Sequence, residues 1–317
     1  MVNDFVMGID IGGTNTVYGF INRKGEIIHY DQILTNGDKP IYNLLDRLEK
    51  HLKDFLDANS TKSLKGIGIG APNGNYYTGN IENPPNLNWG SIDIKSILEK
   101  KFQSKVLLTN DANAAAIGEK SYGAAKKMND FVMITLGTGL GSGIYANNKL
   151  IYGCDGFAGE MGHIIVENDG RRCNCGNKGC LESYVSANGI NKTIDQMMIK
   201  YPESNLLRKL RNRKEAGKIL DMAYDENHEI ATKIYSYTGK MLGRGLSIVA
   251  TLLSPEAFIF YGGYSNAGSR IFDYAKEEMN KNLLEGQKGK IKIIRSKLLD
   301  GQAGVLGAAA LIWSHER

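Results

Sequence analysis

Hydrophobic positions along the chain alternate between short runs and longer patterns with helical spacing. Between residues 41 and 56, leucines recur every three or four positions, which predicts an amphipathic helix. The apolar run 66–70 is typical of a buried strand. Strands that alternate with helices in this way predict an α/β fold. Further helices are expected over 92–102, 112–120, 230–253 and 303–313 and after Ser265, and further strands over 106–108, 257–261 and 291–294.

The chain contains an internal repeat. Residues 4–20 align without a gap on residues 130–146; both copies begin with the letters DFVM, and Gly13 aligns with Gly139. Each copy reads as an apolar strand, a glycine-rich turn and a second apolar strand, followed by a hairpin turn. A chance identity is the alternative, but the shared layout favours a duplicated half and mixed sheets.

Length and composition narrow the class of protein. A chain of 317 residues is long enough for about two domains of roughly 150 residues each. With 42% hydrophobic and 23% charged residues, and a net charge of +5 that is spread thinly, we expect a globular protein without a nucleic-acid partner. No apolar run is long enough for a membrane span, and the N-terminus has no secretory pattern, so a cytoplasmic location is expected. The polar segment 192–229 is expected to be a helical elaboration without obvious chemistry.

Glycine-rich turns follow the strands of both repeats. In the first, Asp10 precedes a turn in which backbone amides and a hydroxyl can contact phosphate, and its carboxylate can hold Mg²⁺. Ordinary hairpin turns are the alternative. The P-loop pattern is absent, and Ser142 stands where a dinucleotide fingerprint needs its third glycine. The candidate nucleotide-binding residues are Asp10, Gly12, Gly13, Thr14 and Asn15, then Gly137, Thr138 and Gly139, and finally Gly262 and Gly263 after a later strand.

Three cysteines lie within eight residues. Cys173, Cys175 and Cys180 supply three thiolates on a glycine-containing loop, and His163 is the nearest histidine in the sequence. Zinc prefers four such ligands in a tetrahedron, and a site with four protein ligands is structural. The pattern therefore predicts a closed Zn²⁺ site, with unligated cysteines as the alternative.

Carboxylates flank this cluster in the sequence. Glu160 precedes His163 by three residues, and Glu182 follows the last cysteine by two. A zinc ion on one imidazole nitrogen would orient the other nitrogen. Carboxylates and an imidazole together suit the hydroxyl groups of a polyol, although each glutamate alone is more often solvated.

Asp111 stands between a predicted strand and an alanine-rich helix. The first interpretation is a helix N-cap, which Asn110 and Asp111 both favour. The second is a general base at a strand end, where ligands of open α/β sheets bind. Both hold if Asn110 caps the helix and Asp111 points toward a ligand.

Taken together, these motifs resemble the ROK family, which includes repressors, uncharacterised open reading frames and sugar kinases. Asn15 stands where many members have lysine, which leaves the phosphate contacts of that turn open. The matching stretches are DIGGT (10–14), NDANAAA (110–116), LGTGLGSG (136–143), EMGH (160–163), CNCGNKGCLE (173–182), GG (262–263) and AGVLGAAAL (303–311).

The resemblance implies an actin-like (ribonuclease H-like) duplicated fold with an active site in the cleft between two domains, 1–111 plus 303–317 and 112–302. It implies a hexokinase, most simply a glucokinase, that uses ATP, Mg²⁺ and structural Zn²⁺ and forms a homodimer. Asp111 then accepts the proton of the sugar 6-hydroxyl. The implied sugar ligands are Asn86, Asn110, Glu160, His163 and Glu182; the implied ATP contacts are Gly13, Thr14, Thr138, Gly139, Gly262 and Gly263; the implied zinc ligands are His163, Cys173, Cys175 and Cys180.

Two alternatives remain at this point. An N-acetylhexosamine kinase could use the same glutamates and histidine. A sugar-responsive repressor of the same family carries an N-terminal helix-turn-helix domain, whereas the first strand here is expected to begin by Asp4.

Overall fold

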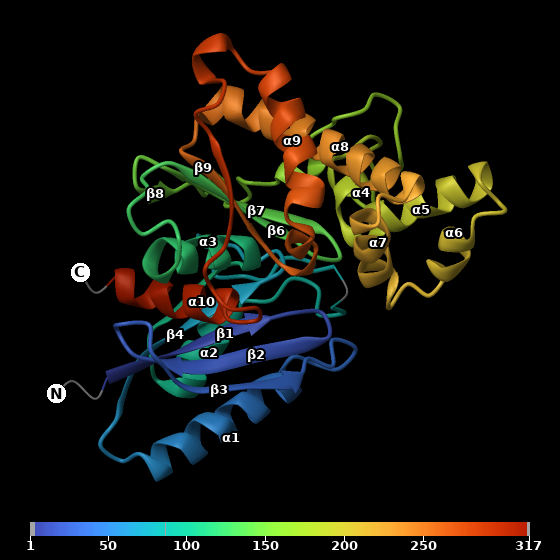
Figure 1. Ribbon diagram of the computed structural model, residues 1–317. Helices are drawn as coiled ribbons and strands as arrows, with labels where there is room; N and C mark the ends of the chain where they lie inside the picture. The colour runs from blue at the N-terminus through green and yellow to red at the C-terminus, as the bar shows by residue number, and fades with distance from the viewer. Residues whose placement is uncertain (1–3, 86, 316–317) are drawn as a thin grey trace. The chain divides into compact units, whose positions relative to one another are not determined.

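A computed structural model describes residues 4–85 and 87–315. Within them are two five-stranded mixed sheets with corresponding strand orders, β3-β2-β1-β4-β5 and β8-β7-β6-β9-β10 (Figure 1). This correspondence confirms the duplication that the repeat predicts. The strands are β1 (Asp4–Ile11), β2 (Asn15–Ile21), β3 (Ile27–Leu34), β4 (Ser63–Ala71), β5 (Val106–Asn110), β6 (Phe131–Leu136), β7 (Leu140–Ala146), β8 (Lys149–Leu150), β9 (Ala257–Tyr261) and β10 (Lys292–Arg295).

The first sheet combines a hairpin with parallel strands. β1 pairs antiparallel with β2 and parallel with β4, and β4 pairs parallel with β5. The predicted turn after β2 is confirmed: the Asn22 side chain accepts hydrogen bonds from the backbone N–H groups of Lys24 and Glu26, and Gly25 has a φ of +84°. Helices α1 (Tyr42–Ala58) and α2 (Ile94–Phe102) pack their buried leucines into the same core as β1 and β4.

Helices α3 (Asp111–Tyr122) and α10 (Ala303–Ser314) pack closely on this sheet and on each other. A Cβ atom on Gly68 of β4 would lie 1.7 Å from the Ala308 carbonyl oxygen, and one on Gly307 would lie 1.6 Å from that of Ala114. Glycine is therefore required at both helix contacts. These two glycine contacts, which we call the glycine seam, fix α3, and with it Asp111, against the sheet.

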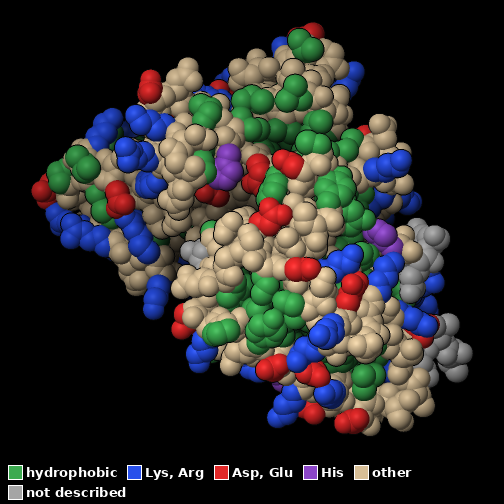
Figure 2. All heavy atoms as spheres, turned by 180° about the vertical axis from the view of Figure 1, so that it is seen from behind, with side chains coloured by type: hydrophobic (Ala, Val, Ile, Leu, Met, Phe, Trp, Pro, Cys, Tyr) green, Lys and Arg blue, Asp and Glu red, His purple; other side chains and the backbone are tan. Residues whose placement is uncertain are grey.

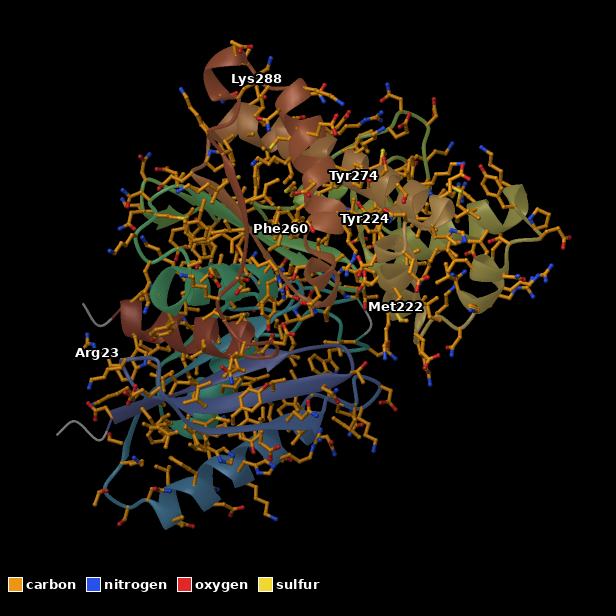
Figure 3. All side chains as sticks on the ribbon, in the orientation of Figure 1. Arg23, Met222, Tyr224, Phe260, Tyr274 and Lys288 are labelled. Atoms are coloured by element: carbon orange, nitrogen blue, oxygen red, sulfur yellow. The ribbon has the colours of Figure 1, made fainter. Side chains whose placement is uncertain are left out.

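The second sheet carries the remaining helices. β6 pairs parallel with β9, and β9 with β10. Tyr224 and Tyr274 point toward each other with their hydroxyls 3.2 Å apart, which joins α7 to α9 (Figure 3). The helices are α4 (Glu182–Val185), α5 (Ala187–Lys200), α6 (Asn205–Lys209), α7 (Ala216–Asp225), α8 (Glu229–Leu253) and α9 (Ser269–Lys281), with 3-10 turns η1 (Met161–His163), η2 (Gly263–Ala267) and η3 (Glu285–Gln287).

The expected helical elaboration 192–229 consists of most of α5 with α6 and α7. Basic side chains are numerous on the α5–α7 part of the surface (Figure 2). Acidic partners offset part of this charge, since Arg213 pairs with Asp195 and Arg208 with Glu203. Among the described helices, none combines the length and the apolar character that a membrane span requires.

The chain forms two compact units. Unit 1 comprises residues 1–129, 143–159 and 296–317, and unit 2 comprises 130–142 and 160–295. This division differs from the expected domains 1–111 plus 303–317 and 112–302, because α3 packs against α10 and because residues 143–159, which include the end of β7 and all of β8, belong to unit 1. Helix α10 lies with the N-terminal strands, as the resemblance implies.

Candidate active site

Two carboxylates of unit 1 follow parallel strands. Asp10 lies near the end of β1, and Asp111 follows β5 as the first residue of α3. The carboxyl ends of β1, β4 and β5 share one edge of the sheet, where ligands of α/β folds bind. A Cβ on Gly70 would lie 3.8 Å from Asp10 Oδ1 and 3.6 Å from Asp111 Cα. Gly70 thus separates the two aspartates at that edge.

The environment of this pair disfavours ionisation of both carboxyl groups. Burial, and to a smaller extent the negative charge of Asp111, raise the pKa of Asp10 to about 7. Burial also raises the pKa of Asp111, while the backbone N–H of Ala112, 2.8 Å from its Oδ1, acts in the opposite direction. The Asp111 carboxyl nevertheless keeps accessible surface, so it is surrounded by protein yet open to a ligand. Two such carboxyl groups suit Mg²⁺, which prefers oxygen ligands.

Gly304, in the first turn of α10, completes the surroundings of Asp10. A Cβ at this position would lie 2.2 Å from Asp10 Oδ2, so only glycine leaves room for the carboxylate. Sequence reasoning did not single out this residue. The sequence feature that could have identified Gly304 is the high content of glycine and alanine between residues 303 and 310, which is typical of close helix packing.

Hydrogen bonds from a buried threonine stabilise the first glycine turn. Thr35 donates its hydroxyl to the Gly12 carbonyl at 2.7 Å and its N–H to the Thr14 carbonyl at 2.8 Å. Gly13, Thr14 and Asn15 are exposed, so an anion can approach this turn. The sequence interpretation missed Thr35, since a threonine 20 residues from the turn carries no local signal.

Asn110 caps α3, as the first of the two interpretations predicts. Its Oδ1 accepts a hydrogen bond from the Ala112 N–H at 2.8 Å, and its backbone is extended. The cap leaves Asp111 as the adjacent accessible carboxyl. Asn86, a predicted sugar ligand, lies outside the described residues.

Unit 2 places its two glycine turns together. β6 and β9 are parallel neighbours, and each ends at such a turn. Gly262 has a φ of +97°, and a Cβ there would lie 2.5 Å from the Leu136 carbonyl oxygen. Thr138 and Gly263 are exposed, and the Gly137 N–H donates to the Gly139 carbonyl at 3.0 Å. This sheet edge offers backbone N–H groups and a hydroxyl to a phosphate chain.

The predicted zinc ligands converge in unit 2. The ligand atoms of His163, Cys173, Cys175 and Cys180 all lie within 4.8 Å of one another. Cys173 Sγ is 3.7 Å from His163 Nδ1, and Cys175 Sγ is 3.6 Å from Cys180 Sγ. A tetrahedron with Zn–S bonds of about 2.3 Å has edges of about 3.8 Å, so the donor set fits zinc.

A bound cation would stabilise the thiolates of this cluster. Burial, and then the neighbouring cysteines, raises the pKa of Cys180 to about 12. Arg171 braces the loop: its guanidinium donates to the carbonyls of Ser183 and Gly189 and lies 4.8 Å from the ring centre of Tyr184. A zinc ion would displace the thiol protons and neutralise the crowded sulfurs.

The two glutamates occupy different positions beside this cluster. His163 Nε2 lies 3.9 Å from Glu160 Oε2, on the side of the ring away from the sulfurs, and Glu160 is exposed. Glu182 accepts a hydrogen bond from the Leu140 N–H at 2.9 Å, and its other oxygen lies 4.0 Å from Cys173 Sγ. Glu182 therefore connects the cysteine loop to the glycine turn before β7, a role that the sequence did not reveal.

Comparison with known proteins gives a consistent result. The ROK family model matches residues 6–315. A glucokinase of Halalkalibacterium halodurans is 33% identical over 100% of this chain and 97% of its own length. A xylose repressor of Caldicellulosiruptor bescii is 32% identical over 98% of this chain and 78% of its own length.

A solved structure extends the comparison to the fold. The ROK family glucokinase from Streptomyces griseus, in complex with glucose and AMPPNP, is 31% identical with a TM-score of 0.79 over 97% of this chain and 98% of its own. This likeness and the paired sheets confirm the predicted α/β, actin-like architecture.

Proposed function

The chain belongs to the ROK family and is an ATP-dependent hexokinase, and we propose that it transfers the γ-phosphoryl group of ATP to the 6-hydroxyl of glucose with Asp111 as the general base. The observation that carries the proposal is the accessible carboxyl of Asp111 beside Asp10 at the carboxyl edge of the first sheet. The glucose and AMPPNP of the Streptomyces griseus relative support the choice of both substrates.

Asp111 removes the proton of the attacking hydroxyl. Its raised pKa makes it a better proton acceptor than an ordinary aspartate, because a base is most effective when its pKa approaches the working pH. Capping by Asn110 and packing of α3 on α10 hold the carboxyl in one orientation. Phosphoryl transfer depends mainly on such positioning and on charge neutralisation.

Each unit has its own set of proposed phosphate contacts. Gly13 and Thr14 in unit 1 are the proposed N–H and hydroxyl donors, with Gly12 and Asn15 beside them; the Gly12 N–H itself donates to the Asn15 carbonyl at 3.0 Å. Asp10 would hold Mg²⁺, which neutralises phosphate charge when bound. In unit 2, Gly137, Thr138, Gly139, Gly262 and Gly263 form the second set of contacts.

The proposed sugar-binding side chains lie around the zinc ligands. His163 Nδ1 faces the cysteines and Nε2 faces Glu160, so a metal on Nδ1 leaves Nε2 for a hydroxyl. Zinc would supply structural rigidity here, not Lewis-acid chemistry, because four protein ligands close its coordination. In unit 2, Glu160, His163 and Glu182 are the proposed hydroxyl ligands; Asn110 and Asn86 are proposed as further ligands on the resemblance to the family alone. We further propose that the enzyme acts as a homodimer in the cytoplasm and feeds glycolysis.

A coupled phosphorylation assay tests the substrate. ATP is offered with glucose, mannose, N-acetylglucosamine and N-acetylmannosamine, and glucose is expected to show the highest kcat/KM. A preference of tenfold or more for an N-acetylated sugar would identify an N-acetylhexosamine kinase instead. Sugar binding without phosphorylation of any of the four would favour a sensor similar to the repressors of the family.

A further inference from the structure

Unit 1 contains a cavity that no predicted active-site residue lines. Its volume is about 700 Å³, and α3, α10, β8 and the turn between β2 and β3 surround it. All of its described lining residues belong to unit 1, so one unit forms it alone. Sites for small organic ligands commonly have volumes of about 300–1,000 Å³.

Positive charge dominates the lining. Five cationic side chains surround the cavity, and none of the described lining residues is acidic. None of the five makes an ion pair with a described carboxylate; Lys120 donates instead to the Met128 carbonyl at 2.6 Å. Cations gathered without counter-charges repel one another, and a bound anion would relieve this repulsion. They are Arg23, Lys24, Lys120, Lys126 and Lys149.

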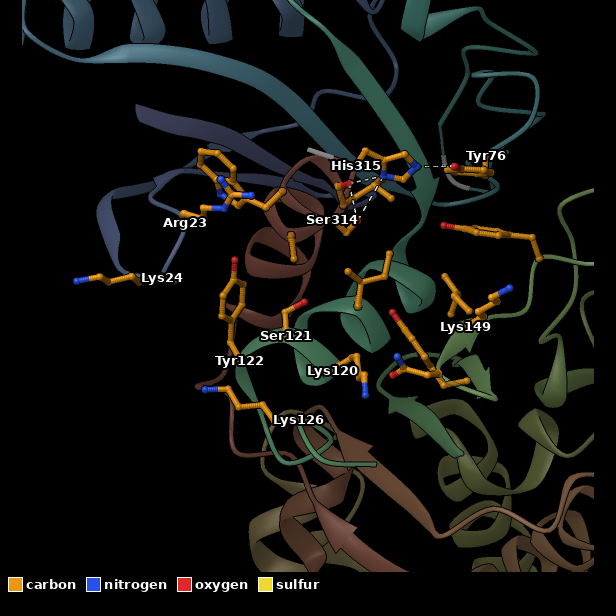
Figure 4. A pocket seen from close by; sticks show the side chains of 18 residues that line it. Arg23, Lys24, Tyr76, Lys120, Ser121, Tyr122, Lys126, Lys149, Ser314 and His315 are labelled. Atoms are coloured by element: carbon orange, nitrogen blue, oxygen red, sulfur yellow. Dashed lines mark hydrogen bonds between the residues drawn. The ribbon is translucent and has the colours of Figure 1, made fainter. Parts of the chain in front are cut away.

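The floor of the cavity is apolar, and its walls are aromatic. Ile117 and Leu311 form a buried cluster against which Leu150 packs. Tyr76 stacks on Tyr152 with ring centres 4.2 Å apart. Figure 4 shows Arg23, Lys24, Tyr122 and Lys126 on one side of the space and Tyr76, Lys149 and His315 on the other.

Trp313 provides an independent indication of a ligand. The residue is 5% exposed and lines the cavity, and the Arg23 guanidinium lies 5.8 Å from its ring centre. Its indole Nε1 is buried and has no hydrogen-bond partner among the described residues. A buried N–H without a partner is unfavourable, so an acceptor on a ligand would stabilise it.

We propose that this cavity binds a nucleoside monophosphate as an effector, with the phosphate among the cations and the base against the aromatic and apolar walls. A sugar phosphate fits less well. Sugar hydroxyls need carboxylate or amide partners, and Asn148 is the sole amide among the described lining residues. The cations, by contrast, match a phosphate, and tyrosine rings stack well on a flat base.

Calorimetric titration of the full chain with AMP tests the assignment. Saturating glucose and AMPPNP are present throughout, so that AMP cannot report on the active site. The test variant is Arg23→Glu/Lys149→Glu, which reverses two exposed charges on opposite sides of the cavity. The matched control is Lys39→Glu/Lys105→Glu, which reverses two exposed charges of unit 1 outside the cavity. Unchanged glucokinase activity without AMP shows that both variants fold.

We expect one AMP per chain in the wild type and in the control, and at least about tenfold weaker binding in the test variant, because two charge-assisted contacts are lost. Inorganic phosphate and glucose 6-phosphate are titrated in parallel and should bind at least about tenfold more weakly than AMP. The proposal is overturned if AMP does not bind the wild type or if the test variant binds AMP as well as the control. Equal binding of inorganic phosphate or glucose 6-phosphate would overturn it as well, because the base would then not be recognised.

Discussion

Substitution of Asp10 by asparagine should stabilise the protein while it weakens Mg²⁺ binding. Asp10 ionises near pH 3.8 in an unfolded chain and near pH 7 in the folded protein, where burial and the charge of Asp111 oppose its ionisation. The folded state therefore binds the extra proton between these values, and stability is lost as the pH rises from about 4 to about 7. Asparagine has no charge to bury, so the variant does not lose stability over this pH range.

The magnitude follows from the two pKa values. At 1.36 kcal/mol per pH unit, the raised pKa of Asp10 costs the folded state about 4 kcal/mol at pH 8 and about 1.7 kcal/mol at pH 5, where the unfolded chain has already released the proton. These are upper limits, because the Asp10 side chain keeps some solvent contact that lowers the cost. We expect the stability of Asp10→Asn relative to the wild type to increase by about 1–2 kcal/mol from pH 5 to pH 8.

Urea unfolding of both proteins at the two pH values measures this gain. The difference in unfolding free energy between Asp10→Asn and the wild type removes the contributions of titrating groups that both proteins share, including the cysteine–histidine cluster. Mg²⁺ with ATP should raise the unfolding midpoint of the wild type at pH 8 more than that of the variant, because Asp10 is the proposed ligand. A gain that is equal at both pH values would refute the raised pKa, and equal stabilisation by Mg²⁺ would refute the metal role.

Three further predictions concern the base, the zinc ligands and the glycine seam. Asp111→Asn should lower kcat by about 10²–10⁴-fold while glucose binding, measured by calorimetry, stays within a few-fold; near wild-type turnover would exclude the role. Cys173→Ser should remove the one equivalent of zinc seen by elemental analysis and lower the Tm, whereas Cys154→Ser, outside the cluster, should keep the metal; retention of zinc in both would count against the site. Gly307→Ala should cost about 1–3 kcal/mol, because its methyl group would meet the Ala114 carbonyl, whereas Gly217→Ala, with open space around it, should change stability by less than about 1 kcal/mol; similar losses in denaturation curves would contradict the packing argument.

Periodicity and turn residues predicted the elements well where local pattern decides the structure. The leucine spacing of α1, the hairpin turn before β3 and the end of α8 at Ser254 all appear in the structure. The repeat predicted a duplicated half, which the matching strand orders confirm. These features depend on residues close in sequence, so one chain suffices to read them.

Features that depend on distant segments were harder to predict. The observed boundary between the units differs from the predicted one because α3 packs on α10, which lies nearly 200 residues away in the sequence. The positions of Thr35, Gly304 and Glu182 follow from contacts that only the folded chain creates. The cluster of candidate zinc ligands was an exception, since the spacing of cysteines along the chain indicates a metal site before the fold is known.

The most direct test of the central claim is phosphorus NMR of the purified protein incubated with glucose, ATP and Mg²⁺. The wild type should produce the resonance of glucose 6-phosphate together with ADP, and Asp111→Asn should produce it far more slowly under the same conditions. A wild-type sample that leaves glucose unphosphorylated, or a variant that matches its rate, would contradict the account.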